Sequence, residues 1–129
     1  MKRFLTLIIA GIVCANAAFP ANSIEKGRRL RIVTYNVGAF GKTDESDIRT
    51  VAGMIEELGA DAIALQETDS CTARSGRDTA QVELFCKEMD GSKDTAGWQP
   101  FFGKAMPFDG GAYGVGAAIA PHIRVIRTH

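Results

Sequence analysis

The stretch RIVTYNVGAF, residues 31–40, decides the fold. Residues 30–37 are mainly apolar or β-branched, and that length and composition predict a buried β-strand. Gly38 and Gly41 follow and end the run. The unusual feature is Asn36, because a short polar amide comes at the end of a segment that is otherwise built for burial. A strand ending of this kind calls for a partner for the amide.

A helix and a second strand follow this segment. Polar residues 43–46 offer Thr43, Asp44 or Ser46 as an N-cap, and Gly59 is a C-terminal stop. Apolar residues recur between them at helical spacing: Ile48, Val51, Ala52, Ile55 and Leu58. The sequence DAIALQE, residues 61–67, is a brief apolar run that is too short for a helix and bounded by turn and polar residues, so it predicts another strand.

Strand, helix and strand in this order form a βαβ unit, whose two strands run parallel through a right-handed crossover. The carboxyl ends of parallel neighbours meet at one edge of the sheet, where open α/β sheets bind ligands. Asn36 closes the first predicted strand and Glu67 closes the second. We therefore expect these two side chains to face one crevice.

The remainder of the chain predicts a second helix and a set of β segments. Residues 80–89 place Val82, Phe85, Cys86 and Met89 on one side of that helix. Residues 98–106, 110–120 and 123–128 are β-like segments separated by Gly, Pro and Asp, which favours a hairpin series.

The N-terminus has the pattern of a secretory signal peptide. Lys2 and Arg3 precede an apolar run, and an A-x-A cleavage site follows at residues 15–17. The alternative, a membrane anchor, needs about 20 apolar residues, more than this run contains. We expect residues 1–17 to be removed, 18–29 to be a linker, and 30–129 to be one domain that is exported to the periplasm or secreted, without a transmembrane segment after cleavage.

The net charge bears on the kind of binding partner, and the cysteine content bears on a possible disulfide. Loss of residues 1–17 leaves 13 basic and 15 acidic residues, a net charge of −2 that argues against a nucleic-acid-coating surface. Small basic clusters such as Arg74 with Arg77 are interpreted as solvated surface, with contact to a polyanion as the alternative. Cys71 and Cys86 remain after cleavage, and an even number in an exported chain permits a disulfide. The alternative is that Cys86 simply packs on its helix face.

The paired strand ends indicate a chemistry. A carboxylate such as Glu67 is a hard oxygen ligand for Mg²⁺, which takes one or two protein carboxylates and fills its other positions with water and substrate phosphate. An amide beside it, Asn36, can orient a phosphate or a metal-bound water without adding negative charge. Either residue alone would be a weak signal.

At this point the ordered set of motifs resembles a known family. RIVTYNV, an amphipathic helix, ADAIALQET, GW and GGAYGVGAAIA occur in this order between Leu30 and Ala120. They look like the N-terminal part of the endonuclease/exonuclease/phosphatase superfamily, which is similar to deoxyribonuclease I and includes abasic-site endonucleases, sphingomyelinases and inositol-phosphate phosphatases. The resemblance implies an α/β fold, a four-layer sandwich of two mixed sheets flanked by helices, of which residues 30–129 supply the N-terminal half.

The resemblance also implies roles for individual residues. Asn36 maps to the phosphate and metal site, and Glu67 maps to a direct ligand of Mg²⁺, with Mn²⁺ as the alternative ion. Tyr113 is interpreted as mainly structural, with a substrate contact as the alternative. The implied reaction is metal-assisted hydrolysis of a phosphoester in a nucleic acid, a phospholipid head group or an inositol phosphate. No obligate protein partner is indicated.

The second half of the family's machinery does not appear after Ala120. An Asp-x-Asn pair and an Asp-His pair are missing, and neither His122 nor His129 follows an aspartate. We therefore expect a truncated domain with one apolar sheet face uncovered. Two hypotheses stay open, an exported Mg²⁺-dependent phosphoesterase whose catalytic second half is missing and a non-catalytic relic or binding module that keeps only the βαβ half.

Overall fold

The computed structural model describes residues 29–41, 47–91 and 97–128. Its elements combine strands and helices in a mixed α/β arrangement. In chain order they are β1 (Ile32–Asn36), the 3-10 turn η1 (Gly38–Phe40), α1 (Ile48–Leu58), β2 (Ala62–Ser70), α2 (Gln81–Asp90), β3 (Gln99–Phe108) and β4 (Gly111–Ile119). The predicted signal peptide and all but the last residue of the predicted linker lie outside the described residues.

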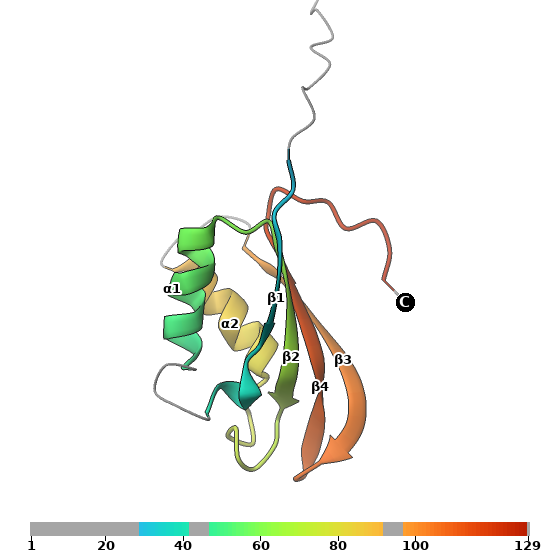
Figure 1. Cartoon of the computed structure of the whole chain (residues 1–129). Coiled ribbons are helices and arrows are strands. Elements are labelled where there is room, and N and C mark those ends of the chain that lie inside the picture. The colour runs from blue at the N-terminus through green and yellow to red at the C-terminus, as the bar shows by residue number, and fades with distance from the viewer. Residues whose placement is uncertain (1–28, 42–46, 92–96, 129) are drawn as a thin grey trace, which may run out of the picture.

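The four strands form one mixed sheet in the order β1-β2-β4-β3 (Figure 1). β1 pairs with β2 in parallel, and Asn36 lies opposite Gln66 in that register. β4 is antiparallel to both of its neighbours, and β3 and β4 form a hairpin. The predicted βαβ unit, in which two parallel neighbouring strands are joined through a helix, is confirmed.

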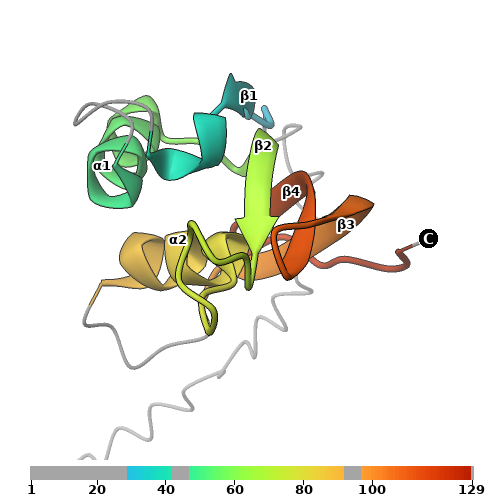
Figure 2. The same ribbon diagram turned by 90° about the horizontal axis from the view of Figure 1, so that it is seen from below.

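Both helices cover the same face of the sheet, as Figures 1 and 2 show from two directions. The core lies between the helices and the sheet. It contains apolar side chains from both helices and from β2: Val51, Ala52, Ile55, Val82, Phe85, Cys86, Met89, Ile63 and Leu65. Burial of this set is the main favourable term in folding. The predicted apolar faces of both helices are confirmed except at Leu58, which is 44% exposed at the end of α1.

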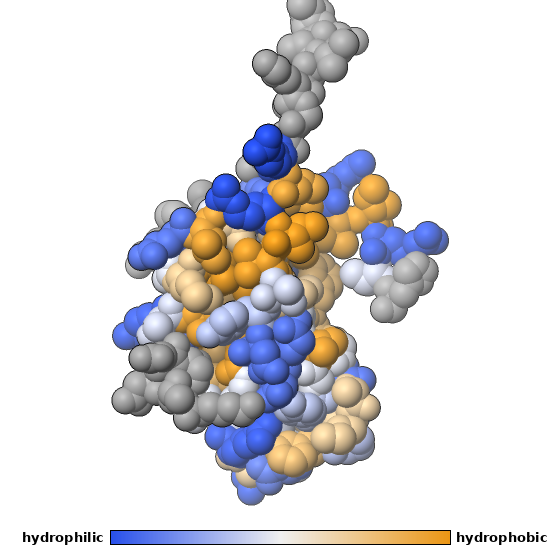
Figure 3. Space-filling model, in the orientation of Figure 1, coloured by the Kyte–Doolittle hydropathy of each residue, from blue (hydrophilic) through white to orange (hydrophobic). Residues whose placement is uncertain are grey.

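No described helix covers the opposite face of the sheet. Ile32 is 72% exposed and Val115 is 52% exposed on this face. The C-terminal segment, residues 121–128, crosses part of it, and Val125 lines a cavity there with Phe101 and Ile119. Figure 3 shows apolar surface around the upper end of β1. None of the helices in the described part of the chain has both the length and the apolar character needed to cross a bilayer.

Three boundary predictions were wrong. The N-cap of α1 is Asp47 rather than a residue within 43–46. β2 continues to Ser70 rather than ending at Glu67, because a bulge after Leu65 lets it keep pairing with β4. Residues 123–128 form no strand despite their apolar alternation, because they lie over the face of β3 and β4 rather than along a strand edge that could accept hydrogen bonds.

Both cysteines within the described residues are free thiols. Cys71 is exposed, whereas Cys86 is buried within the core beneath α2, which matches the packed alternative rather than a disulfide. Burial raises the pKa of Cys86 to about 12, with further contributions from the charges of Asp90 and Glu83. Cys86 is therefore protonated and unreactive at neutral pH.

Glycines in β4 allow its neighbours to approach closely. A Cβ atom on Gly116 would lie 2.5 Å from Cγ2 of Val82, so this glycine sets the distance between α2 and the sheet. The hairpin before β4 turns on Asp109 and Gly110, with φ of 48° and 81°. Two successive positive φ values belong to the tight turn that Asp-Gly sequences favour.

We predict opposite effects of alanine at two glycines. Gly116→Ala should lower the free energy of unfolding by about 1–3 kcal/mol, because the stiff Val82 side chain must move. Gly53→Ala should raise it by about 0.5–1 kcal/mol, because Gly53 lies inside α1 with nothing within 4 Å of its added Cβ. Urea unfolding followed by circular dichroism measures both. A Gly116→Ala variant as stable as the parent would contradict the close packing.

We predict that Cys86 reacts only when the chain unfolds. In a C14S/C71S variant, iodoacetamide at pH 8 should label Cys86 at the rate of global unfolding, because the folded thiol is buried and its pKa is about 12. The unfolded chain loses this proton first, so the fold should lose stability as the pH rises from about 9 toward 12. The C14S/C86S variant, which keeps Cys71, is the control and should react at once. Equal labelling rates for the two thiols would disprove the burial.

Candidate metal and phosphate site

The two residues predicted to share a crevice come from adjacent parallel strands. Asn36 is the last residue of β1. Glu67 lies in the bulge of β2, where the pairing with β4 shifts between Leu65 and Thr68 and Glu67 has a φ of 59°. Positive φ is costly for a residue with a side chain, and a bulge redirects the side chain it carries. The bulge therefore aims Glu67 away from the regular alternation of the strand.

A hydrogen bond joins the two predicted site residues directly. Nδ2 of Asn36 donates to Oε1 of Glu67 at 2.9 Å, and the backbone N–H of Gly38 donates to Oδ1 of Asn36 at 3.0 Å. Because an N–H group requires an acceptor, the second bond sets which way the amide points. Asn36 thus holds and orients the Glu67 carboxylate, which is the arrangement expected of a residue that supports a metal ligand.

A strained turn forms the second wall of the site. Gly38, Ala39 and Phe40 have φ values of 54°, 56° and 51°, all in the left-handed region. Gln81, at the start of α2 and only 5% exposed, holds this turn by donating to the carbonyl of Ala39 at 2.7 Å. The same Gln81 side chain accepts from the backbone N–H of Asp69 at 2.7 Å. One buried amide thereby ties the strained turn to the strand that carries Glu67.

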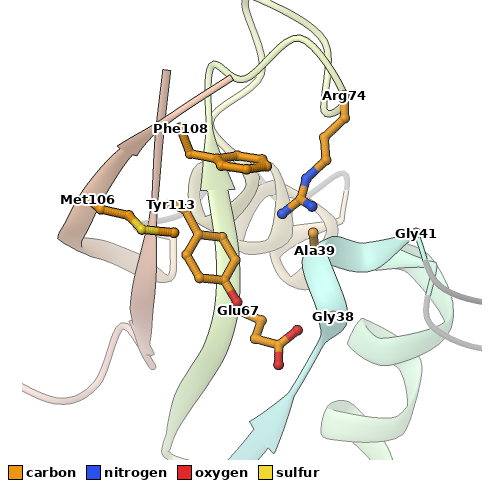
Figure 4. Close-up of a pocket in the computed structure, with 8 residues that line it drawn as sticks. All are labelled: Gly38, Ala39, Gly41, Glu67, Arg74, Met106, Phe108 and Tyr113. Carbon is orange, nitrogen blue, oxygen red and sulfur yellow. The ribbon is translucent and has the colours of Figure 1, made fainter. Parts of the chain in front are cut away.

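A cavity of about 440 Å³ opens between these walls. It is lined by residues from the turn, from β2, from the loop after β2 and from the β3–β4 hairpin: Gly38, Ala39, Gly41, Glu67, Arg74, Met106, Phe108 and Tyr113. Figure 4 shows the side chains of Glu67, Arg74 and Tyr113 directed into the same space. The cavity thus combines a carboxylate, a guanidinium and an aromatic wall.

Arg74 is fixed by a buried carboxylate. Nε and Nη2 of Arg74 donate to the two oxygens of Asp69 at 2.6 and 2.9 Å, and Thr72 also donates to Asp69. Burial alone would raise the pKa of Asp69, which is fully buried, but the bonds from Arg74 and Thr72 and the Arg74 charge lower it. The pair therefore stabilises the fold at neutral pH, and this contribution is lost as the pH falls through the lowered pKa.

Two aromatic rings and the hairpin turn also hold Arg74 in place. Its guanidinium carbon lies 4.6 Å from the ring centre of Phe108 and 5.7 Å from that of Tyr113, within the range of cation–π attraction. Its backbone N–H donates to the carboxylate of Asp109 in the hairpin turn at 2.9 Å. Phe108 and Tyr113 thus contact Arg74, which agrees with a mainly structural role for Tyr113 while placing it in the cavity wall.

The cavity lining offers one carboxylate, which suits a magnesium ion bound by a single protein carboxylate. Glu67 offers a carboxylate oriented by Asn36, and the cavity leaves room for water and phosphate at the other positions of the ion. Within residues 29–41, 47–91 and 97–128, no group of three or more His, Cys, Asp or Glu side chains is arranged to hold a metal. His122 bonds Asp61 at 2.8 Å at the opposite end of β2 and is remote from the cavity lining.

Sequence reasoning missed Asp69, Arg74 and Gln81. The sequence favours solvated surface for Arg74, because basic clusters of this size usually lie on solvated faces. The loop instead folds back on its own strand, with the N–H of Cys71 donating to the carbonyl of Thr79 at 2.8 Å. The acidic residue two positions after Glu67 was the available signal, because a buried strand tolerates a carboxylate only with a partner.

We predict that glycine at position 67 is more stable than alanine. Both substitutions remove the carboxylate, but only glycine adopts a φ of 59° without steric cost, so Glu67→Gly should be more stable than Glu67→Ala by about 1 kcal/mol. Glu57, an exposed residue inside α1, provides the inverse control, where glycine should be less stable than alanine by about 1 kcal/mol. Thermal unfolding measures all four. The same order at both positions would contradict a strained bulge.

Comparison with known proteins adds no relative to this site. No protein-family model matches the chain, and no match to a curated protein or to a solved structure was found. Function is therefore inferred from the geometry around Asn36, Glu67 and Arg74, together with the motif order.

Proposed function

We propose that this chain belongs to an exported, Mg²⁺-dependent phosphoesterase of the endonuclease/exonuclease/phosphatase type, with Mn²⁺ as an alternative ion. The observation that carries the proposal is the 2.9 Å hydrogen bond between Asn36 and Glu67 across two parallel strands. A carboxylate held by an amide in a strained bulge beside a cavity is a costly arrangement, and strain of this kind gathers at functional sites.

The chain's own residues divide the work in this proposal. Glu67 binds the ion through its carboxylate, and Asn36 orients that carboxylate while its own oxygen stays committed to the N–H of Gly38. When bound there, Mg²⁺ would supply Lewis-acid chemistry, with polarisation of a phosphoryl oxygen and charge stabilisation at the leaving oxygen of the ester. Tyr113 and Phe108 form an aromatic wall that limits the access of water on one side of the cavity.

The open sheet face supports the wider fold in this proposal. Ile32 and Val115 present apolar surface that no described helix covers, and a second β-sheet packed there would complete a four-layer sandwich. In that arrangement residues 30–129 form the first half of the domain. The second sheet would then bring the general base and the remaining metal ligands to the same crevice.

A specific observation also favours a second candidate function. The described residues that line the cavity include one carboxylate and no histidine, so they offer no imidazole to activate a water molecule. In the alternative proposal the chain is a non-catalytic module that binds a metal and a phosphoester without hydrolysing it. The two candidates agree on Glu67 and differ in turnover.

We predict that Mg²⁺ binds the full chain through Glu67. Titration followed by amide NMR shifts should show the parent binding Mg²⁺ and Glu67→Gln binding it at least about 10-fold more weakly, because the substitution removes the ligand charge and keeps the shape. Asn36→Ala should weaken binding about 10-fold by releasing the carboxylate. Glu57→Gln, which removes an exposed carboxylate on α1, is the matched control and should bind as the parent does.

Equal Mg²⁺ affinity of the parent and Glu67→Gln would contradict the proposed metal site. Assays of the same proteins on duplex DNA, RNA, sphingomyelin and inositol phosphates separate the two candidates. Mg²⁺-dependent hydrolysis that is lost in Glu67→Gln supports the enzyme, whereas metal binding without turnover supports the binding module.

A further inference from the structure

We infer that Arg74 is the phosphate anchor of this cavity, a role that rests on the proposed function only for the identity of the ester carrying the phosphate. Arg74 uses one edge of its guanidinium, Nε with Nη2, to bind Asp69. Neither of these two bonds uses Nη1. The second edge, Nη1 with Nη2, therefore remains for a ligand, and it has the fork geometry that a phosphate accepts in a bidentate manner.

The position of this edge suits an anion in the cavity. Arg74 lines the same space as Glu67, and Figure 4 shows its guanidinium turned inward toward Ala39. A phosphate bound there would meet Arg74 from one side and a cation on Glu67 from the other. At about 440 Å³ the cavity exceeds the size of a phosphate group and leaves room for part of the attached alcohol.

Arg74 is also held in advance of binding. Asp69 fixes its head, the rings of Phe108 and Tyr113 pack against one side of it, and Asp109 binds its backbone N–H. A long side chain that is already ordered loses little further entropy when it binds a ligand. The guanidinium lies over the ring of Phe108 and near that of Tyr113, so the aromatic pair positions Arg74.

Charge balance distinguishes an anchor from a simple loop clamp. Asp69 forms an ion pair with one edge of Arg74. Hydrogen bonding to Asp69 raises the pKa of Arg74, so the guanidinium stays protonated. An arginine serving only as a clamp would need no opening into a cavity. A lysine could pair with Asp69 as well but would lack the second edge.

The test is a titration of the full chain with inorganic phosphate in EDTA, which removes any contribution from a metal. NMR should show saturable shifts of the Arg74 Nε–H group and of the Gly38 and Ala39 amides. Arg74→Lys should bind phosphate at least about 10-fold more weakly, because it loses a charge-assisted bidentate contact. Arg77→Lys, an exposed arginine of the same loop outside the cavity lining, is the matched control and should bind within about 2-fold of the parent.

A double variant guards against misfolding. D69N/R74Q removes both charges together, so no buried carboxylate is left unpaired, and its phosphate affinity should fall as in Arg74→Lys. A second arm titrates a dinucleotide, inositol monophosphate and a short-chain phosphocholine to identify which phosphoryl source depends on Arg74. Phosphate binding that is unchanged in Arg74→Lys and the double variant, or an unshifted Arg74 signal in the parent, would overturn the inference.

The outcome is separable from that of the metal site. Arg74-dependent phosphate binding in EDTA together with Mg²⁺ binding insensitive to Glu67 would support the anchor and reject the proposed metal ligand. Mg²⁺ binding through Glu67 together with phosphate binding indifferent to Arg74 would reject the anchor alone.

Discussion

The parallel pairing of β1 with β2 is the constraint on which the rest of the site depends. Its register sets Asn36 opposite Gln66, and the bulge that follows brings Glu67 within 2.9 Å of the Asn36 amide. A shift of one residue would send every side chain of β1 to the other face of the sheet. The buried contacts of Ile63 and Leu65 beneath the helices resist such a shift, so the packing of the core also positions the candidate ligand.

Local strain and its support form the second level of organisation. Left-handed residues lie on both sides of the cavity, at Glu67 and in the turn at Ala39 and Phe40. Gln81 connects these two strained segments through one buried side chain, and Asp69 fixes Arg74 beside them. Such conformations persist only where the surrounding structure determines them strongly. Buried hydrogen bonds therefore hold the walls of the cavity together, which suits a site that must bind a cation and an anion at a fixed separation.

Much of this arrangement could be predicted from the sequence, because it depends on periodicity and neighbouring elements. The spacing of apolar residues predicts both helices, and the βαβ order alone predicts that Asn36 lies near Glu67. Features set by distant contacts could not be predicted. The bulge at Glu67 depends on β4, and the buried ion pair of Asp69 with Arg74 depends on a loop that folds back. Residues 123–128 have strand composition but no described partner strand.

Paramagnetic broadening by Mn²⁺ is the measurement that tests the central claim most directly, namely that the bulged strand and the strained turn create a metal site. Substoichiometric Mn²⁺ is added to the isotopically labelled chain, and the loss of amide signal is mapped along the sequence. The account predicts the strongest broadening at Asn36, Gly38 and Glu67, falling off along β2 toward Asp61 and His122. Broadening centred on Asp61 and His122, or spread evenly over the acidic surface, would contradict it.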